Sequence, residues 1–126
     1  VHLGQSDLPA EAARQIIGPD KILGVSARTV EEAEKAESDG ADYLGVGAVY
    51  PTTTKGDAEK VSREELEKIC STVRIPVVAI GGLNARNISS LEGSGISGVA
   101  VVSAIMAQDR PEEAARLLKD TVYGIL

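Results

Sequence analysis

The sequence contains no phenylalanine and no tryptophan, and three tyrosines are the only aromatic side chains among its 126 residues. Its core must therefore be built from valine, isoleucine, leucine and alanine, which favours buried parallel strands over an aromatic-rich sandwich. At this length the chain can form one domain with a real core, but not two. The hydrophobic fraction of 43% and the charged fraction of 25% are typical of a globular protein.

Cysteine and histidine are equally scarce. The single cysteine, Cys70, cannot form an intramolecular disulfide, which predicts a reducing, cytoplasmic setting. Cys70 follows Leu66 at helical spacing and has no histidine beside it, so we predict a buried structural thiol and not a nucleophile. The only histidine, His2, lies in an apolar run, and we predict that it is packed and has no catalytic role.

The chain also lacks a net positive charge and long apolar runs. The net charge of −6 argues against nucleic acid or an anionic membrane as a partner. No run approaches the roughly 18 apolar residues of a membrane helix, and no signal segment precedes the first apolar run. The sequence also lacks the His/Cys spacing of a metal site, a Ser-His-Asp pattern and a Walker loop.

Five short apolar runs alternate with segments of helical composition. The predicted strands cover residues 1–4, 22–25, 43–49, 76–80 and 98–102. Predicted helices begin near residues 9, 29, 62, 84 and 109, two of them at the capping boxes of residues 29–32 and 62–65. Continuous apolar strands that alternate with helices predict a parallel α/β fold.

Two parallel architectures fit this alternation: an open doubly wound sheet and a (β/α)₈ barrel. The length favours the open sheet, because a whole barrel needs roughly 200–250 residues. Phosphate-type signals favour the barrel, because they follow the last two strands, at Gly81-Gly82 and Val102-Ser103. We therefore predict the second half of a barrel, about strands four to eight, as a single domain over residues 1–126. Since the chain begins with an apolar run and no methionine, we expect the earlier strands to be missing from it.

Each predicted strand ends in residues suited to phosphate or its metal. Asp7, after the first strand, could ligate Mg²⁺ or simply cap the next helix, and Ser26, after the second, could donate to a phosphate or belong to a turn. The Gly81-Gly82 pair lets a phosphate approach backbone N–H groups. Ser103 lies at the N-terminal mouth of a short helix predicted from Ala104, where the helix macrodipole favours an anion.

The longest such cluster follows the third strand, where Thr52, Thr53, Thr54 and Lys55 come directly after Tyr50-Pro51. Three hydroxyl groups beside a cation suit an anion, most plausibly phosphate. A polar surface loop is the alternative for this segment taken alone. Because clusters follow all five strands, we favour the phosphate-binding interpretation.

These segments resemble the thiamine-phosphate synthase family in residues and in order. The resemblance runs along the whole chain and rests on residues 2–7 (HLGQSD), 23–26 (LGVS), 41–55 (ADYLGVGAVYPTTTK), 76–83 (PVVAIGGL) and 98–105 (GVAVVSAI). It implies a (β/α)₈ barrel that joins hydroxymethylpyrimidine diphosphate to a thiazole phosphate and releases diphosphate through a pyrimidine carbocation.

The resemblance also implies roles for the strand-end residues. Asp7 would ligate Mg²⁺, while Ser26 and Lys55 would act catalytically by donating to the pyrimidine diphosphate. The thiazole phosphate would contact the remaining residues, which are Thr52, Thr53, Thr54, Gly82, Val102 and Ser103.

The family's Gln-x-Arg-x-x-x-Lys cluster and Asn-Asp pair do not occur before Val1. We therefore expect a fragment that is either a homo-oligomer or the complement of a missing N-terminal half. Two alternatives remain: a thiazole tautomerase-like paralogue, and a non-catalytic phosphate-binding half-barrel. A tautomerase-like paralogue is expected to have a histidine shortly after Ser26. Ala27 and Arg28 stand there instead, which argues against this alternative.

Overall fold

A computed structural model describes residues 1–51 and 60–126. Strands and helices alternate along these residues as the apolar pattern predicts. In chain order they are β1 (His2–Leu3), α1 (Ala10–Ile17), β2 (Gly24–Ala27), α2 (Val30–Ser38), β3 (Tyr43–Val46), α3 (Arg63–Thr72), β4 (Val77–Ile80), the 3₁₀ helix η1 (Ile88–Leu91), β5 (Gly98–Ala100), α4 (Ser103–Met106) and α5 (Pro111–Ile125).

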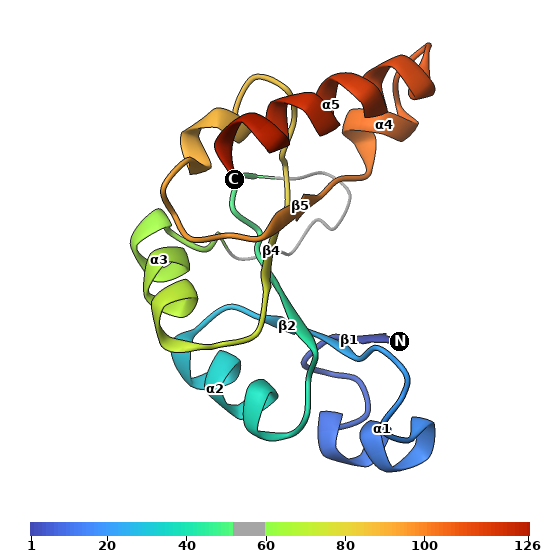
Figure 1. Ribbon diagram of the computed structural model, residues 1–126, viewed down its shortest axis with the longest axis vertical. Coiled ribbons are helices and arrows are strands. Elements are labelled where there is room, and N and C mark those ends of the chain that lie inside the picture. Colours follow the sequence, from blue (N-terminus) through green and yellow to red (C-terminus); the bar gives the residue numbers. More distant parts are fainter. Residues whose placement is uncertain (52–59) are drawn as a thin grey trace.

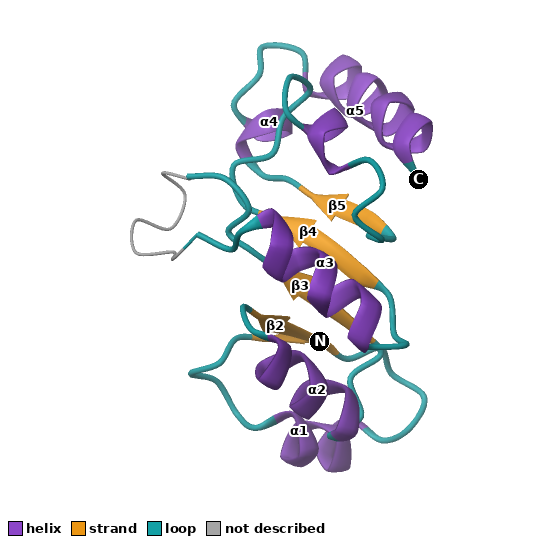
Figure 2. Ribbon diagram, turned by 90° about the vertical axis from the view of Figure 1, so that its left-hand side faces the viewer, coloured by secondary structure: helices purple, strands orange, loops and turns teal. Residues whose placement is uncertain are grey.

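The described strands form one parallel sheet in the order β1-β2-β3-β4-β5. A doubly wound sheet reverses its strand order part-way, whereas sequential order with right-handed crossovers puts every helix on one face. Figure 1 shows the helices in an arc around the strands, and Figure 2 shows α2 and α3 against the same face of the sheet. The sheet is therefore singly wound, and the parallel α/β class is confirmed.

The helix-facing side of the sheet forms the core. Alternate strand residues on this side are almost fully buried against the apolar positions of α2 and α3, as the period of two along a strand requires. The main participants are Val25, Ala27, Leu44, Val46, Val77, Ala79, Ala33, Ala36, Leu66 and Ile69. Six of them have no exposed surface, namely Ala33, Leu44, Val46, Leu66, Ile69 and Ala79.

The residues between these positions point to the opposite, concave face. The register aligns Ser26, Gly45, Val78 and Gly98 in one row across four strands. Ile80, in the next row, is 40% exposed although it lies in a central strand. In the described part of the chain, no helix covers this face in Figure 1.

Several predicted boundaries differ from the structure. The third and fifth strands end at Val46 and Ala100, and not at residues 49 and 102. The second strand spans 24–27 and not 22–25, which leaves Ile22 67% exposed. The helix predicted over 84–91 is reduced to η1, because side-chain oxygens of Asn84 and Asn87 accept from Arg86 N and Asn84 N. Asparagine side chains that bond to nearby backbone groups compete with a regular helix in this way.

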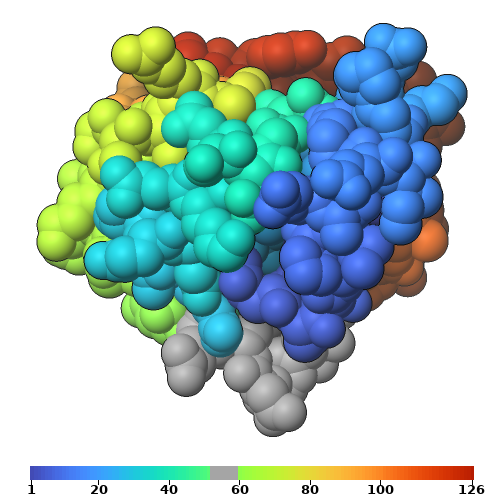
Figure 3. Space-filling view, turned by 90° about the horizontal axis from the view of Figure 1, so that it is seen from below, coloured from blue at the N-terminus to red at the C-terminus, as the bar shows by residue number. Residues whose placement is uncertain are grey.

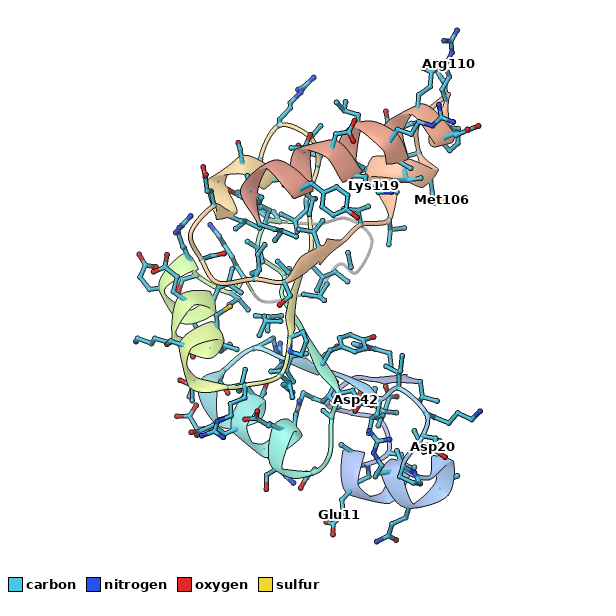
Figure 4. All side chains as sticks on the ribbon, in the orientation of Figure 1. Glu11, Asp20, Asp42, Met106, Arg110 and Lys119 are labelled. Carbon is cyan, nitrogen blue, oxygen red and sulfur yellow. The ribbon has the colours of Figure 1, made fainter. Side chains whose placement is uncertain are left out.

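Carboxylate side chains bind backbone N–H groups just before the amino ends of β2 and β4. Asp42 Oδ2 accepts from Leu23 N at 2.8 Å and from Arg14 Nη2 at 2.7 Å (Asp42 is labelled in Figure 4). The Leu23 N–H and the Arg14 guanidinium lower the pKa of Asp42, so it is ionised at neutral pH. Glu37 caps Arg74 N and Ile75 N in the same manner.

Cys70 lies half-buried in α3, where the Cβ of an added side chain on Gly95 would come within 2.9 Å of Cys70 Cβ. Burial raises the pKa of the Cys70 thiol, which suits the predicted structural role. Across the described residues, none of the helices combines the length and apolarity needed to cross a membrane.

Candidate functional site

Polar residues gather at one edge of the sheet because parallel strands end there together. The turns after β1, β2, β4 and β5 all emerge at this edge, on the left of Figure 2. These turns carry or lead to Asp7, Gly82, Val102 and Ser103, which the sequence predicts as site residues. Ser26, predicted to follow the second strand, lies within β2, one residue before its end. Parallel α/β folds place ligands at this edge, beyond the carboxyl ends of their strands.

Ser26 lies at the centre of a hydrogen-bonded cluster on the concave face. His2 Nε2 is 2.9 Å from Ser26 Oγ, and His2 Nδ1 is 2.9 Å from the Tyr43 hydroxyl. Gln5 Nε2 donates to the Ser26 carbonyl at 2.7 Å. The side chains of three neighbouring strands therefore fix the position of the Ser26 hydroxyl.

Two glycines create the space for the rings of this cluster. A Cβ on Gly24 would lie 2.1 Å from Tyr43 Cζ, so the Tyr43 ring occupies the volume that a side chain at position 24 would need. A Cβ on Gly45 would lie 3.2 Å from His2 Cε1. The His2 and Tyr43 rings are 5.6 Å apart and tilted by 37°, so both lie across the sheet beside Ser26.

His2 is the functional candidate that sequence reasoning missed. We predicted a packed ring, but His2 is exposed and lies within hydrogen-bonding distance of Ser26 and Tyr43. A signal was available in the glycines at positions 24 and 45. Each glycine lies next to an apolar strand residue that faces the core, so it points to the other face and leaves space there where a ring can lie.

Gly81 and Gly82 form a tight turn after β4. Both have positive φ, 101° and 63°, and a Cβ on Gly82 would come within 2.5 Å of the Pro51 carbonyl oxygen. The turn therefore presses against the segment that leaves β3, and Tyr50 N donates to the Gly81 carbonyl at 3.0 Å. Glycine is required here both for the backbone conformation and for the close approach.

Val102 and Ser103 lie where β5 passes into α4. Val102 is the N-cap residue, and its carbonyl accepts from Ile105 N and Met106 N. Ser103 begins the four-residue α4 and is exposed, as predicted for a hydroxyl at the start of a short helix. Met106, at the other end of α4, is labelled in Figure 4, far along the molecule from Asp42.

Asp7 does not cap α1, so the helix-cap alternative for this residue is wrong. The N-cap position belongs to Pro9, while Asp7 Oδ2 accepts from Gly4 N at 2.7 Å. Asp7 also lines a cleft of about 180 Å³ between the β1–α1 loop and α2, two segments that lie side by side in Figure 3. Lys35 of α2 lines the same cleft, and its ion pair with Asp39 raises the pKa of Lys35.

Asp7 Oδ1, the carboxylate oxygen that does not accept from Gly4 N, could bind a divalent cation. Among the described residues, no three carboxylate, histidine or cysteine side chains come together as a ligand set. Mg²⁺ at phosphate sites is commonly held by one or two carboxylates together with substrate phosphates. Asp7 therefore fits as a single protein ligand. Thr52, Thr53, Thr54 and Lys55 lie outside the described residues.

Comparison with known proteins gives a family match that covers these strand-end residues. The model of the family described as "Thiamine monophosphate synthase" matches residues 1–105. The chain belongs to this family. A thiamine-phosphate synthase of Methanobrevibacter smithii is 56% identical over 121 residues, which are 95% of this chain and 58% of that protein. One from Ruminiclostridium cellulolyticum is 58% identical over 120 residues and is matched over 57% of its length.

A solved structure of the family agrees in fold. The structure described as thiamine phosphate pyrophosphorylase from Pyrococcus furiosus matches with a TM-score of 0.91 and 44% identity, over 100% of this chain and 60% of that one. The chain thus spans somewhat under two thirds of the length of the family members it matches.

Proposed function

We propose that this chain carries part of the active site of a thiamine-phosphate synthase. In the reaction, the bond between the pyrimidine methylene carbon and the diphosphate oxygen breaks, and diphosphate leaves. The thiazole nitrogen then forms the new bond to that carbon. The observation that carries the proposal is the common edge of the sheet, in a chain that belongs to this family. Ser26 lies there near the end of β2, while Gly82 and Ser103 follow β4 and β5.

Ser26 is suited to the diphosphate side of the reaction. If Tyr43 donates to His2 Nδ1, then His2 Nε2–H donates to Ser26 Oγ, both over 2.9 Å. The hydroxyl proton of Ser26 is then free to point at an anionic oxygen. A donor already fixed in position stabilises developing negative charge on the leaving diphosphate at no further ordering cost.

Gly82, Val102 and Ser103 are suited to the thiazole phosphate. Within the described residues, no acceptor receives a hydrogen bond from the N–H of Gly82 or Ser103. Glycine leaves the backbone open to close approach, and the exposed Ser103 hydroxyl adds a side-chain donor. With α4 only four residues long, these local donors, and not a helix dipole, would bind the phosphate.

Asp7 and Lys55 complete the diphosphate side of the proposal. Asp7 would hold Mg²⁺ through its free carboxylate oxygen, and bound Mg²⁺ would neutralise charge on the leaving diphosphate. Lys55 would add a second positive charge, and the threonines before it would contact the thiazole substrate. No protein nucleophile is required, because the reaction depends on charge stabilisation and positioning.

We further propose that the five strands correspond to about strands four to eight of a (β/α)₈ barrel. The sequential parallel order and the 40% exposure of Ile80 on the concave face support this. Further β/α units, or a second copy of the chain, would then pair with the edges at β1 and β5 and cover this face.

The two phosphate sites are tested by measuring, for each of two variants, the loss of affinity for each substrate. Ser103→Ala should weaken binding of the thiazole phosphate about 10-fold and Lys55→Ala that of the pyrimidine diphosphate about 10-fold, because each loses a bond to a charged group. Each variant should leave the other ligand's affinity unchanged. Isothermal titration with Mg²⁺ present measures all four affinities, with Ser89→Ala and Lys119→Ala as exposed controls. Equal losses for both ligands in either variant would contradict this assignment.

A further inference from the structure

Asn87 lies behind the Gly82 turn and has no role in the site described above. Its side-chain Nδ2 donates to the Gly82 carbonyl at 2.9 Å, a partly buried contact. Its Oδ1 accepts from Asn84 N at 2.8 Å. Both functional groups of the amide are thus used within one turn, so the orientation of the Asn87 side chain is fixed.

The contact with Asn87 fixes a whole peptide plane. In a planar trans peptide the carbonyl and the following N–H point in opposite directions, so holding the Gly82 carbonyl also sets the direction of the Leu83 N–H. That N–H points away from Asn87. Among the described residues, none accepts a hydrogen bond from Gly82 N or Leu83 N. The Leu83 side chain is only 4% exposed, which anchors the far side of the same peptide.

Gly82 on its own would not hold this orientation. Its φ of 63° lies in a region that glycine enters and leaves at little cost, so the Gly82–Leu83 peptide could rotate and present its carbonyl in place of its N–H. A carbonyl oxygen facing a phosphate would repel it. The bond from Asn87 removes this alternative before the ligand arrives.

We propose that Asn87 is a positioning residue for the phosphate of the thiazole substrate. By holding the Gly82 carbonyl, it keeps the Leu83 N–H directed at the phosphate. It does not touch the ligand. This inference rests on the proposed function, because it assumes that the turn binds the substrate phosphate.

The test replaces one atom of the amide. Asn87→Asp keeps the shape and the acceptor for Asn84 N, but puts an oxygen where Nδ2 donated to Gly82. Asn84→Asp is the matched control. It adds the same charge to the same turn, and it keeps the Oδ1 that accepts from Arg86 N at 2.9 Å. The ligands are the thiazole phosphate and the same thiazole alcohol without phosphate, each titrated by NMR into the folded chain.

We expect Asn87→Asp to lower the ratio of phosphorylated to unphosphorylated thiazole affinity at least about 10-fold further than Asn84→Asp does. The ratio is unaffected by partial unfolding, since both ligands meet the same folded fraction. Equal ratios in the two variants would overturn the role of Asn87. Absence of thiazole phosphate binding in the unsubstituted chain would overturn the proposed function, and this inference with it.

Discussion

Gly81→Ala should lower the free energy of unfolding by about 2–5 kcal/mol, a large stability loss for one added methyl group. Two costs combine at this position. Gly81 has φ of 101°, which an alanine adopts only under strain, and its new Cβ would lie 2.5 Å from Ala48 Cα. The contacted atom belongs to the backbone of Ala48, which is buried. The contact therefore cannot be relieved by rotation of a flexible side chain.

Urea unfolding followed by circular dichroism measures this loss. Gly124→Ala is the matched control, because the same methyl group there would meet no atom within 4 Å, and Gly124 lies in α5. The control should be neutral or slightly stabilising, since alanine favours a helix more than glycine does. If the two variants unfolded at the same urea concentration, the turn after β4 would not be packed against β3 as described.

Gly24→Ala should weaken binding of the pyrimidine diphosphate about 100-fold, the largest binding effect we expect. The new Cβ would lie 2.1 Å from Tyr43 Cζ and 2.4 Å from its hydroxyl oxygen, so the ring must leave its place beside His2. Without Tyr43, His2 loses the contact that sets its tautomer, and Ser26 loses its fixed donor geometry. Two hydrogen bonds of about 1 kcal/mol each, together with misplacement of Ser26, account for this size.

Gly98→Ala is the control for this binding loss. Gly98 lies in the same row of the concave face as Ser26, yet a Cβ there would meet nothing within 4 Å. Calorimetric titration of both variants, with the urea midpoint measured alongside, separates binding from stability. Equal affinities in Gly24→Ala and Gly98→Ala would contradict a role for the His2, Ser26 and Tyr43 cluster.

Local pattern in the sequence was enough to predict most of the fold. Ala33 and Ala36 in one helix, and Leu66, Ile69 and Val73 in the next, recur at helical spacing and are all buried. The N-caps predicted at Thr29 and Ser62 are confirmed, since these hydroxyls accept from Glu32 N and Glu65 N. Such features depend on residues three or four apart, which the sequence displays directly. Over residues 1–51 and 60–126, the reciprocal half of each capping box is not formed, because the Glu32 and Glu65 carboxylates accept from Arg28 N and Val30 N.

The parts that could not be predicted depend on contacts between distant residues. His2 lies 41 residues from Tyr43 and 24 from Ser26, so their cluster exists only once β1, β2 and β3 are in register. The start of β2 was predicted two residues early because Ile22 and Leu23 look like strand residues locally. Only the pairing with β3 places Gly24 opposite Tyr43 and leaves Ile22 outside.

The roles of Asp7, Ser26, Gly82, Val102 and Ser103 stay predictions, although all five lie at the expected edge or in turns that lead to it. The same holds for Mg²⁺ and for the segment from Thr52 to Lys55. These assignments depend on ligands, and ligand contacts follow from neither apolar periodicity nor strand register. The binding measurements above address the roles of Ser26, Lys55, Gly82 and Ser103.

The central claim is that the carboxyl edge of this sheet binds the thiazole phosphate. Titrating the ¹⁵N-labelled chain with that ligand, and following backbone amide resonances, tests this claim most directly. We predict that the largest shifts occur at Gly82, Leu83, Ser103 and Ala104, and that they saturate together. Saturable shifts confined to the cleft between the β1–α1 loop and α2, or no saturable shifts at all, would contradict the account.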